Sequence, residues 1–273
     1  MIYDLHIHHD LFDLPPQKLL DGMDKAGIAG GVVLSPSAVP FFEGDRIVRA
    51  PKERIDNVMA FTKDSDRLYP FFFIDPTDKD AIDQVHYALD QGIAGFKTIC
   101  THFYPDDERA VPVYHEIAQS GKPYLFHSGI LYDGKNASGN YNRPCNFEVL
   151  LSVPKLRFAL AHISWPWCDE CIAVFGKFQN YLEISGEQGA AEMFIDTTPG
   201  TPALYREDAL RKLIAMGAED HMIWGTDCKT DYSAEYAQSI RARDEEVMSR
   251  IEGGDRILKK WYSENFMRFL TGK

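Results

Sequence analysis

Residues 2–8 read IYDLHIH, a short β-forming run over 2–6 that leads into two histidines, His6 and His8. Side chains two apart on a strand point to the same face of a sheet, so both imidazoles can enter one coordination sphere. An isolated pair of this kind is weak evidence, because such pairs also occur on ordinary strands. Whether His6 and His8 bind a metal ion depends on which residues the other strands bring beside them.

Seven more short apolar runs follow, with helix-like amphipathic segments between almost every pair. The eight predicted strands are residues 2–6, 29–35, 69–75, 94–99, 123–127, 157–162, 181–185 and 222–226. The runs are nearly continuous in apolar residues, which is typical of parallel strands covered on both faces. Alternating strands and helices predict a parallel α/β fold. Eight repeats, without a GxGxxG motif after the first strand, favour a closed (β/α)8 TIM barrel over an open doubly wound sheet.

The length and charge of the chain narrow the class of protein. Its 273 residues suit one barrel domain over 1–273, since such barrels take about 250 residues. The 29 Lys and Arg against 41 Asp and Glu give a net charge of −12, which repels nucleic-acid phosphate and anionic membranes. The apolar runs fall short of the roughly 20 residues of a membrane span, and residues 1–10 do not resemble a signal peptide. We expect a cytoplasmic protein with a small-molecule substrate and no nucleic-acid or membrane partner, which can form a homo-oligomer.

Polar residues of ligand type stand at the ends of several predicted strands, where barrel enzymes carry their chemistry. They are His6 with His8, His127, His162 and Asp227. Zinc and similar cations accept imidazole nitrogen and carboxylate oxygen together. Three histidines and one aspartate (His6, His8, His127 and Asp227) would hold such an ion and leave room for a water. The sequence therefore predicts a metal site at this rim.

Asp227 and His162 are the predicted catalytic residues. A bound divalent cation lowers the pKa of water toward about 7. Asp227 is placed to take the proton of that water. His162 would polarise a substrate carbonyl or protonate a leaving group, which suits a side chain that titrates near neutrality. A hydrogen-bonded core histidine is the other interpretation of His162.

Five cysteines without an export signal argue against a disulfide framework. Cys168 and Cys171 form a lone CxxC, which is compatible with a redox pair, with half a zinc site, or with two partly buried cysteines at a helix start. The third interpretation is favoured, because no second CxxC accompanies the first.

Seven motifs run along the chain in order. They are DLHIH at 4–8, GFK at 95–97, FHSG at 126–129, RP at 143–144, LAHISWPW at 160–167, WGTDC at 224–228 and NFMRFL at 265–270. Together they resemble the amidohydrolase superfamily, and within it the amidohydrolase-related (amidohydrolase 2) branch that includes aminocarboxymuconate-semialdehyde decarboxylase and its relatives. The resemblance covers essentially the whole chain, and the set is specific although each piece alone is not.

The resemblance implies a distorted (β/α)8 barrel with one divalent ion, usually zinc, held by the residues matching His6, His8, His127 and Asp227. His162 matches the catalytic histidine of the family. Other branches of the superfamily hold two ions bridged by a carboxylated lysine on the fourth strand.

Lys97 lies on the fourth predicted strand. A binuclear site, with carboxylated Lys97 as the bridge and His127 and His162 at the second ion, is therefore an alternative. Otherwise Lys97 binds a substrate carboxylate or has a structural role.

Three functions are compatible with these residues. The leading one is hydrolysis of an amide, ester or lactone bond of a small molecule by metal-activated water. The alternatives are nonoxidative decarboxylation of a small carboxylate at the same ion, and a noncatalytic metal-binding protein on the same barrel. Arg143 is the best candidate to bind a substrate carboxylate, because guanidinium binds bidentately. Trp165, in the loop after the sixth strand, would suit a flat ligand.

Overall fold

The computed structural model of the chain describes residues 1–9, 14–39, 50–134, 137–185 and 189–273. Within these residues, parallel strands form one sheet in the order β8-β7-β6-β5-β4-β3-β2-β1-β9. The strands are β1 (Tyr3–His8), β2 (Gly30–Leu34), β3 (Leu68–Phe73), β4 (Gly95–Thr98), β5 (Tyr124–Phe126), β6 (Arg157–Leu160), β7 (Glu192–Asp196), β8 (Met222–Ile223) and β9 (Cys228–Lys229).

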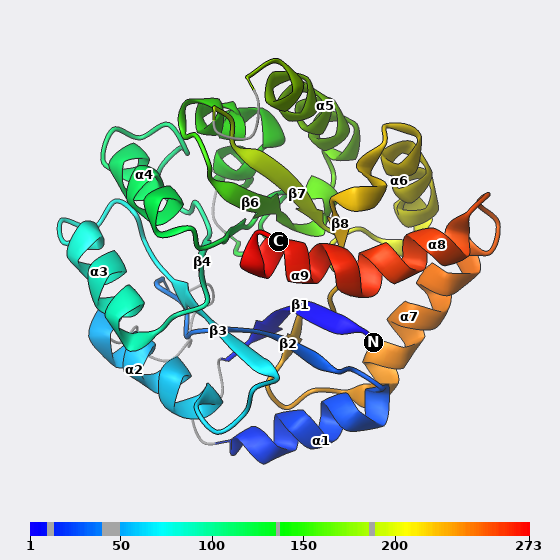
Figure 1. The fold of residues 1–273 in the computed structure, drawn as a ribbon, viewed down its shortest axis with the longest axis horizontal. Helices are drawn as coiled ribbons and strands as arrows, with labels where there is room; N and C mark the ends of the chain where they lie inside the picture. The colour runs from blue at the N-terminus through cyan, green and yellow to red at the C-terminus, as the bar shows by residue number, and fades with distance from the viewer. Residues whose placement is uncertain (10–13, 40–49, 135–136, 186–188) are drawn as a thin grey trace.

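The sheet closes on itself because its two outermost strands are successive pieces of one segment. β8 pairs with β7, and after residues 224–227 the chain continues as β9, which pairs with β1. Between these pieces, the Leu5 N–H donates to the Trp224 carbonyl oxygen at 3.1 Å. The eighth strand of the barrel is thus split. The fold is a distorted (β/α)8 TIM barrel, which confirms the predicted fold class (Figure 1).

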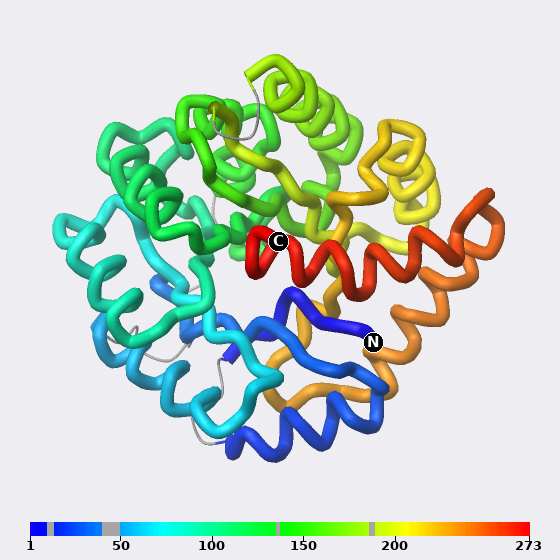
Figure 2. Tube along the Cα trace, viewed as in Figure 1, coloured from blue at the N-terminus to red at the C-terminus, as the bar shows by residue number. Residues whose placement is uncertain are grey.

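Helices surround the sheet and alternate with its strands (Figures 1 and 2). The α-helices are α1 (Pro16–Ala26), α2 (Pro51–Thr62), α3 (Ala81–Gln91), α4 (Ala110–Ser120), α5 (Cys168–Ser185), α6 (Ala203–Ala215), α7 (Ala234–Met248), α8 (Gly254–Lys259) and α9 (Asn265–Thr271). The short helices are η1 (Ser138–Asn142), η2 (Pro144–Ser152), η3 (Ala161–Ser164), η4 (Ala218–Asp220) and the π-helical turn η5 (Lys260–Glu264). Within the described residues, no helix is both long and apolar enough to cross a membrane.

The helix α1 shows how the sequence produces these elements. It begins at Pro16, whose ring fixes a helical φ at the first position. It buries Leu19, Met23 and Ala26, which recur at helical spacing and face the sheet. It ends at Gly27, where φ is 75°, a left-handed conformation that glycine adopts without steric cost.

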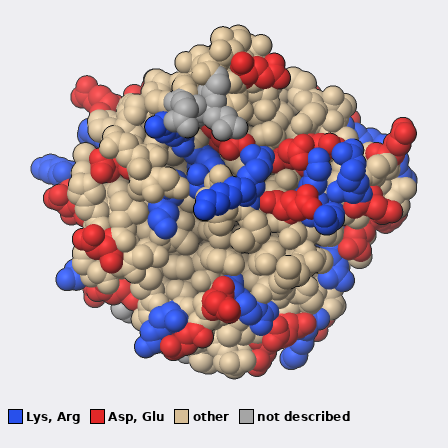
Figure 3. All heavy atoms as spheres, viewed as in Figure 1, with Lys and Arg blue, Asp and Glu red and all other residues tan. Residues whose placement is uncertain are grey.

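The helix α9 closes the N-terminal end of the barrel (Figure 1). Its Phe266 and Phe269 enter the inner core of the barrel. Tyr3, near the start of β1, stacks on Phe266 with ring centroids 4.8 Å apart. On the surface of this end, Lys and Arg lie beside Asp and Glu over the C-terminal helices (Figure 3). The C-terminal ends of the strands therefore form the other, open end.

The seventh predicted strand, 181–185, is wrong. These residues form the last turn of α5, where Tyr181 is 37% and Ile184 is 75% exposed. Their apolar side chains face solvent, so they do not form a core strand. The true seventh strand is β7, whose Met193, Phe194 and Ile195 are fully buried.

The other predicted strands also differ by one or two residues or more in their bounds, and two of these differences concern the histidine pair and the eighth strand. β1 continues through His8, two residues beyond the predicted 2–6, so the histidine pair belongs to the strand itself. The predicted 222–226 strand stops pairing at Ile223, and residues 224–227 form the gap in the eighth strand.

Candidate metal centre

Six side chains from five segments meet at the C-terminal end of the barrel. His6 and His8 come from β1, and Lys97 comes from β4. The others are His127 just after β5, His162 in η3 after β6, and Asp227 between β8 and β9. The rings of His6 and His162 have centroids 5.3 Å apart, and those of His127 and His162 are 5.0 Å apart. All five predicted ligand and catalytic positions are thus brought into one cluster.

The two nitrogens of the His6 ring have different partners. Nδ1 lies 2.7 Å from Asp196 Oδ2, and both side chains are almost fully buried. Because a carboxylate only accepts, Nδ1 carries the proton and Nε2 keeps its lone pair. Nε2 points into the cluster, 3.1 Å from His8 Nε2 and 3.5 Å from Asp227 Oδ1. Metal-ligating histidines commonly donate the N–H of the ring nitrogen that does not bind the metal to a carboxylate, as His6 does here.

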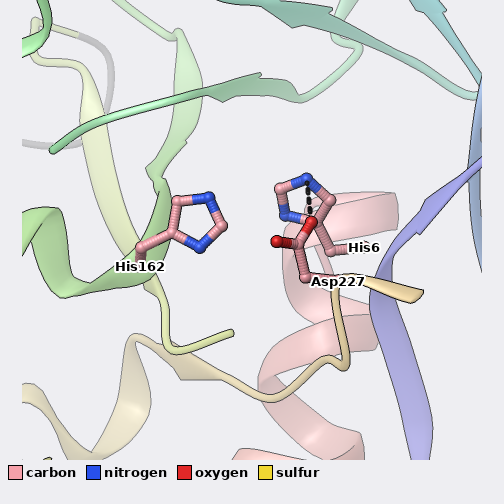
Figure 4. Close-up of side chains that lie close together, drawn as sticks. All are labelled: His6, His162 and Asp227. Carbon is pink, nitrogen blue, oxygen red and sulfur yellow. Dashed lines mark ion pairs between the residues drawn. The ribbon is translucent and has the colours of Figure 1, made fainter. Parts of the chain in front are cut away.

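Asp227 lies beside both histidines of β1. Its Oδ1 is 3.1 Å from His8 Nε2, and its carboxylate stands next to the His6 ring (Figure 4). Burial raises the pKa of this carboxyl, but the neighbouring His6 and His8 outweigh burial and hold the pKa well below its usual range. The group is therefore ionised at neutral pH. The Asp227 backbone is left-handed, with φ of 59°, a conformation that Asp tolerates better than most residues.

His127 contributes a buried nitrogen without a partner. Its backbone N–H donates to the Thr98 carbonyl oxygen at 2.8 Å, which fixes the start of the loop after β5. Its side-chain Nε2 is buried and has no hydrogen-bond partner among the described residues. Burial holds the pKa of the imidazole well below its ordinary value, so the ring is neutral. A buried polar atom left unsatisfied is costly, which makes it a candidate ligand atom for an ion.

His162 occupies an unusual backbone turn. His162, Ile163 and Ser164 all have left-handed φ values, of 62°, 47° and 53°. Thr201 Oγ1 donates to the His162 carbonyl oxygen at 2.6 Å, and Thr198 Oγ1 lies 2.9 Å from His162 Nδ1. The other ring nitrogen is then the one available to the cluster.

The surroundings of His162 also fix its charge and its ring position. Burial lowers the pKa of the ring to about 4, so the imidazole is neutral. A Cβ atom at Gly200 would come 2.6 Å from His162 Cγ, so only glycine leaves room for the ring there.

Lys97 is fully buried, and its Nζ lies 3.5 Å from His6 Nε2. Burial lowers the pKa of this amine to about 8, although Asp196 and Asp227 act in the opposite direction. A substantial fraction of the amine is therefore uncharged near neutral pH, which is the form that can react with carbon dioxide.

The donor set fits a divalent cation. Donor atoms of His6, His162 and Asp227 all lie within 4.8 Å of one another. These three side chains face one another in Figure 4. Neutral imidazoles, an ionised carboxylate and the unpartnered His127 Nε2 are the groups that zinc accepts. His162 belongs to this tight group, although the sequence analysis assigned it to catalysis and not to the metal.

Sequence reasoning missed Asp196, the partner of His6. Asp196 is the last residue of β7, in the apolar run AEMFID, which repeats the pattern of an apolar strand ending in a ligand-type residue. The misplaced seventh strand hid this signal.

Sequence reasoning also missed Asp4, which is fully buried and accepts a hydrogen bond from the His6 backbone N–H at 3.0 Å. Asp4 stands inside the DLHIH motif, so its position was visible but its contacts were not.

Arg143 and Trp165 lie in the loops of this end, and no described contact joins their side chains to those of the cluster. Arg143 Nη2 is bound by Glu170 Oε2 at 2.5 Å, and its guanidinium lies over the Trp167 ring. The positive charge of Arg143 is thus already matched. Trp165 lies between Tyr132 and Tyr205, with ring centroids 6.3 and 5.9 Å away.

Cys168 and Cys171 stand in the first turn of α5 as free thiols. Burial raises the pKa of Cys168 to about 11 and that of Cys171 to about 12. Both thiols are therefore protonated, as expected of structural cysteines at a helix start.

Several solved structures are similar to this chain. Among solved structures, an uncharacterised TIM-barrel protein from Bordetella bronchiseptica is 18% identical, with a TM-score of 0.67 over 100% of this chain and 99% of that one. An amidohydrolase II structure is 14% identical, with a TM-score of 0.69 over 99% and 100% of the two chains. A probable 2-pyrone-4,6-dicarboxylic acid hydrolase from Acinetobacter baumannii, solved with citric acid, is 13% identical, with a TM-score of 0.63 over 100% and 99%.

These likenesses show the shared barrel fold. No curated protein matches the sequence. A family model described as Amidohydrolase matches residues 3–270, nearly the entire chain and every strand of the barrel. The chain belongs to the amidohydrolase family.

Proposed function

We propose that this protein is a metal-dependent hydrolase that cleaves an amide, ester or lactone bond of a small molecule. One divalent ion, with zinc as the best match, would be held by His6, His8, His127 and Asp227. The observation that carries the proposal is the convergence of ring nitrogens of His6 and His162 and the Asp227 carboxylate within 4.8 Å of one another, together with a buried His127 Nε2 that has no partner among the described residues.

When bound, a divalent cation supplies Lewis acidity and makes water a nucleophile near neutral pH. Asp227, which is ionised, accepts a proton from the attacking water. His162 enters the reaction as a neutral imidazole, because its pKa of about 4 lies far below neutrality. Its free ring nitrogen takes the proton from Asp227 and delivers it to the leaving nitrogen or oxygen, so that both side chains return to their starting states. Asp196 keeps the His6 lone pair turned inward throughout.

Trp165 is proposed to contact the flat or apolar part of the substrate. Tyr132 is 70% and Tyr205 is 50% exposed beside it, so these rings form an aromatic edge made by the loops after β5 and β6 and the first turn of α6. Trp165 follows His162 by three residues, and its N–H donates to the His162 carbonyl oxygen at 3.1 Å. We expect Trp165→Ala to raise KM about tenfold with kcat little changed, and Trp165→Phe to restore most of the loss.

The number of ions is a separate question, because Lys97 is buried beside His6 and part of its amine is uncharged. With one ion, Lys97→Gln keeps the metal content of the protein unchanged. With two ions bridged by carboxylated Lys97, the same substitution lowers the content from two ions per chain to one.

Decarboxylation receives less support than hydrolysis. Its predicted carboxylate clamp, Arg143, is engaged by Glu170. The neighbour described as a 2-pyrone-4,6-dicarboxylic acid hydrolase acts on a cyclic ester, and this places lactones first in a substrate screen.

Metal analysis of the purified protein, with a screen of lactones, esters, amides and unsaturated carboxylates, tests the proposal. We expect a stoichiometric divalent metal, hydrolysis that stops after chelation and returns with zinc, and circular dichroism that is nearly unchanged in the metal-free protein. Absence of a stoichiometric metal, or hydrolysis that survives chelation, would refute the proposal. Unfolding on chelation would instead indicate a structural ion.

A further inference from the structure

Asp4 is a buried carboxylate that no step of the proposed reaction uses. It lies two residues before His6 on β1 and is 0% exposed. Burial alone would make an ionised carboxylate costly at this position. Four hydrogen bonds converge on it, and they come from three different segments of the chain.

The two oxygens of Asp4 divide these bonds between them. Oδ1 accepts from the backbone N–H groups of His6 at 3.0 Å and Thr226 at 2.9 Å. Oδ2 accepts from the hydroxyls of Thr226 at 2.6 Å and Tyr232 at 2.8 Å. Thr226 directly precedes Asp227. Asp4 Oδ1 therefore links the backbone of the predicted ligand His6 to the residue next to the predicted ligand Asp227.

The sheet is irregular on both sides of Asp4. On β1, the pairing with β2 shifts register between Asp4 and Ile7, which is the mark of a β-bulge. Across from it, the eighth strand is split, and residues 224–227 stand outside the ladder of both β8 and β9. The carboxylate of Asp4 thus accepts from two N–H groups at the points where the regular ladder is interrupted.

Close packing keeps this arrangement from shifting. A Cβ at Gly225 would come 3.0 Å from Asp4 Oδ1, and a Cβ at Gly31 would come 2.7 Å from the Asp4 carbonyl oxygen. Thr226 Oγ1 also accepts from the Cys228 N–H at 3.1 Å, which starts the pairing of β9. The backbone of Asp227 is therefore held from the residues on each side of it.

We propose that Asp4 is a positioning residue of the metal centre, which sets the spacing between His6 and Asp227 through their backbones. This inference rests on the proposed metal site. Substitution of a residue that hydrogen-bonds to a metal ligand typically lowers the metal affinity by about 10- to 100-fold. Asp4 would act on the backbone beside the ligands, through the N–H groups of His6 and Thr226, and not on a ligand ring.

Three variants test this role. Asp4→Ala removes all four hydrogen bonds. Asp4→Asn keeps one oxygen for the two backbone N–H groups, and its amide N–H groups can donate to the hydroxyl oxygens of Thr226 and Tyr232 once the hydroxyl protons turn away. Ile55→Ala, in the buried face of α2, is the matched control, because it leaves a cavity in the core and destabilises the fold without touching the centre.

The readouts are the affinity for Zn²⁺ and the visible absorption of the Co²⁺-substituted protein, both independent of turnover. We expect Asp4→Ala to lower the affinity at least tenfold and to change the Co²⁺ spectrum, Asp4→Asn to weaken binding about threefold, and Ile55→Ala to change neither. If Asp4→Ala does not fold, Asp4→Asn alone decides, and an unchanged affinity and spectrum in it overturn the proposal.

Two other results also overturn this role. One is wild-type binding in Asp4→Ala, and the other is an equal loss in Ile55→Ala, which would make the effect one of general stability. Wild-type protein that binds no ion would refute the proposed function itself, and is thereby distinguished from failure of the Asp4 role.

Discussion

The two ends of the barrel differ in whether their polar side chains have partners within the chain. At the N-terminal end, α9 lies across the strands, and its Arg268 pairs with Glu192 at the start of β7. Arg157, at the start of β6, donates to the Phe269 carbonyl oxygen at 3.0 Å. At the C-terminal end, imidazoles crowd together, and His127 Nε2 has no partner in the described residues. The arginines of the N-terminal end are paired within the chain, whereas the His127 nitrogen among the ligand-type side chains of the other end is not.

The polar groups that stabilise the folded protein are therefore different from those that are available to bind a ligand. A polar group that already has its partner contributes to folding and has little to offer a ligand. A buried group without one destabilises the free protein and gains when a ligand arrives. The difference predicts that substitutions at the two ends will affect different measurements.

The largest expected effect is at the open end. Asp227→Asn removes the charge that attracts the ion and the group that takes the proton, while Asn tolerates the same left-handed backbone. We expect kcat/KM to fall at least about 1000-fold, which corresponds to about 4 kcal/mol, with circular dichroism unchanged. Steady-state kinetics with metal analysis measures it, and retention of normal activity would contradict the assignment.

The next effect belongs to the closed end. Phe269 is fully buried in the inner core of the barrel and meets Phe194 at 5.2 Å between ring centroids. Phe269→Ala should lower the free energy of unfolding by about 3–5 kcal/mol, by loss of buried area and creation of a cavity. Urea unfolding of the metal-free protein measures this loss. Affinity for Zn²⁺ should stay as in the wild type, and a parallel loss of affinity would show that the two ends are coupled.

Asp196→Asn is expected to have a moderate effect at the open end. The amide can still accept from His6 Nδ1 through its oxygen, but it no longer has the charge that fixes the tautomer. We expect a 10- to 100-fold loss of metal affinity. Isothermal titration checks this, with Thr197→Ser, at the neighbouring buried position, as the control. Unchanged affinity would leave Asp196 with a packing role only.

The smallest effect is a pH dependence at the closed end. Burial raises the pKa of Glu192, but His221 and Arg268 outweigh burial and hold the pKa below its ordinary value. A carboxyl with a lowered pKa stabilises the folded state above the ordinary value and loses this contribution as the pH falls through the lowered one. Glu192→Gln should therefore cost about 1 kcal/mol at pH 7, and the cost should shrink below about pH 4. Urea unfolding across this range tests the sign, and a cost that grows on acidification would be contrary to it.

The sequence analysis located the barrel and the cluster because both depend on local pattern. His6, His127 and Asp227 each stand at or just after a short apolar run, and parallel strands in a barrel bring such positions to one rim. Little knowledge of side-chain packing is needed for that step.

The parts that were missed depend on contacts between distant segments. The run at 181–185 has the composition of a strand, yet its apolar side chains emerge from the end of a helix into solvent. Arg143 stays a predicted substrate contact, but its ion pair with Glu170, 27 residues later, was not visible from the sequence. Three of the four hydrogen bonds to Asp4 come from Thr226 and Tyr232, more than 220 residues away, and no short-range pattern reveals them.

The left-handed backbone at Asp227 has a consequence for how this protein can change by mutation. Glycine, asparagine and aspartate enter that region with little penalty, whereas glutamate and most other residues do not. Codons for aspartate and asparagine differ by one base. On the proposed mechanism, a single nucleotide change would therefore remove the charge of Asp227 and leave a well-formed barrel without activity.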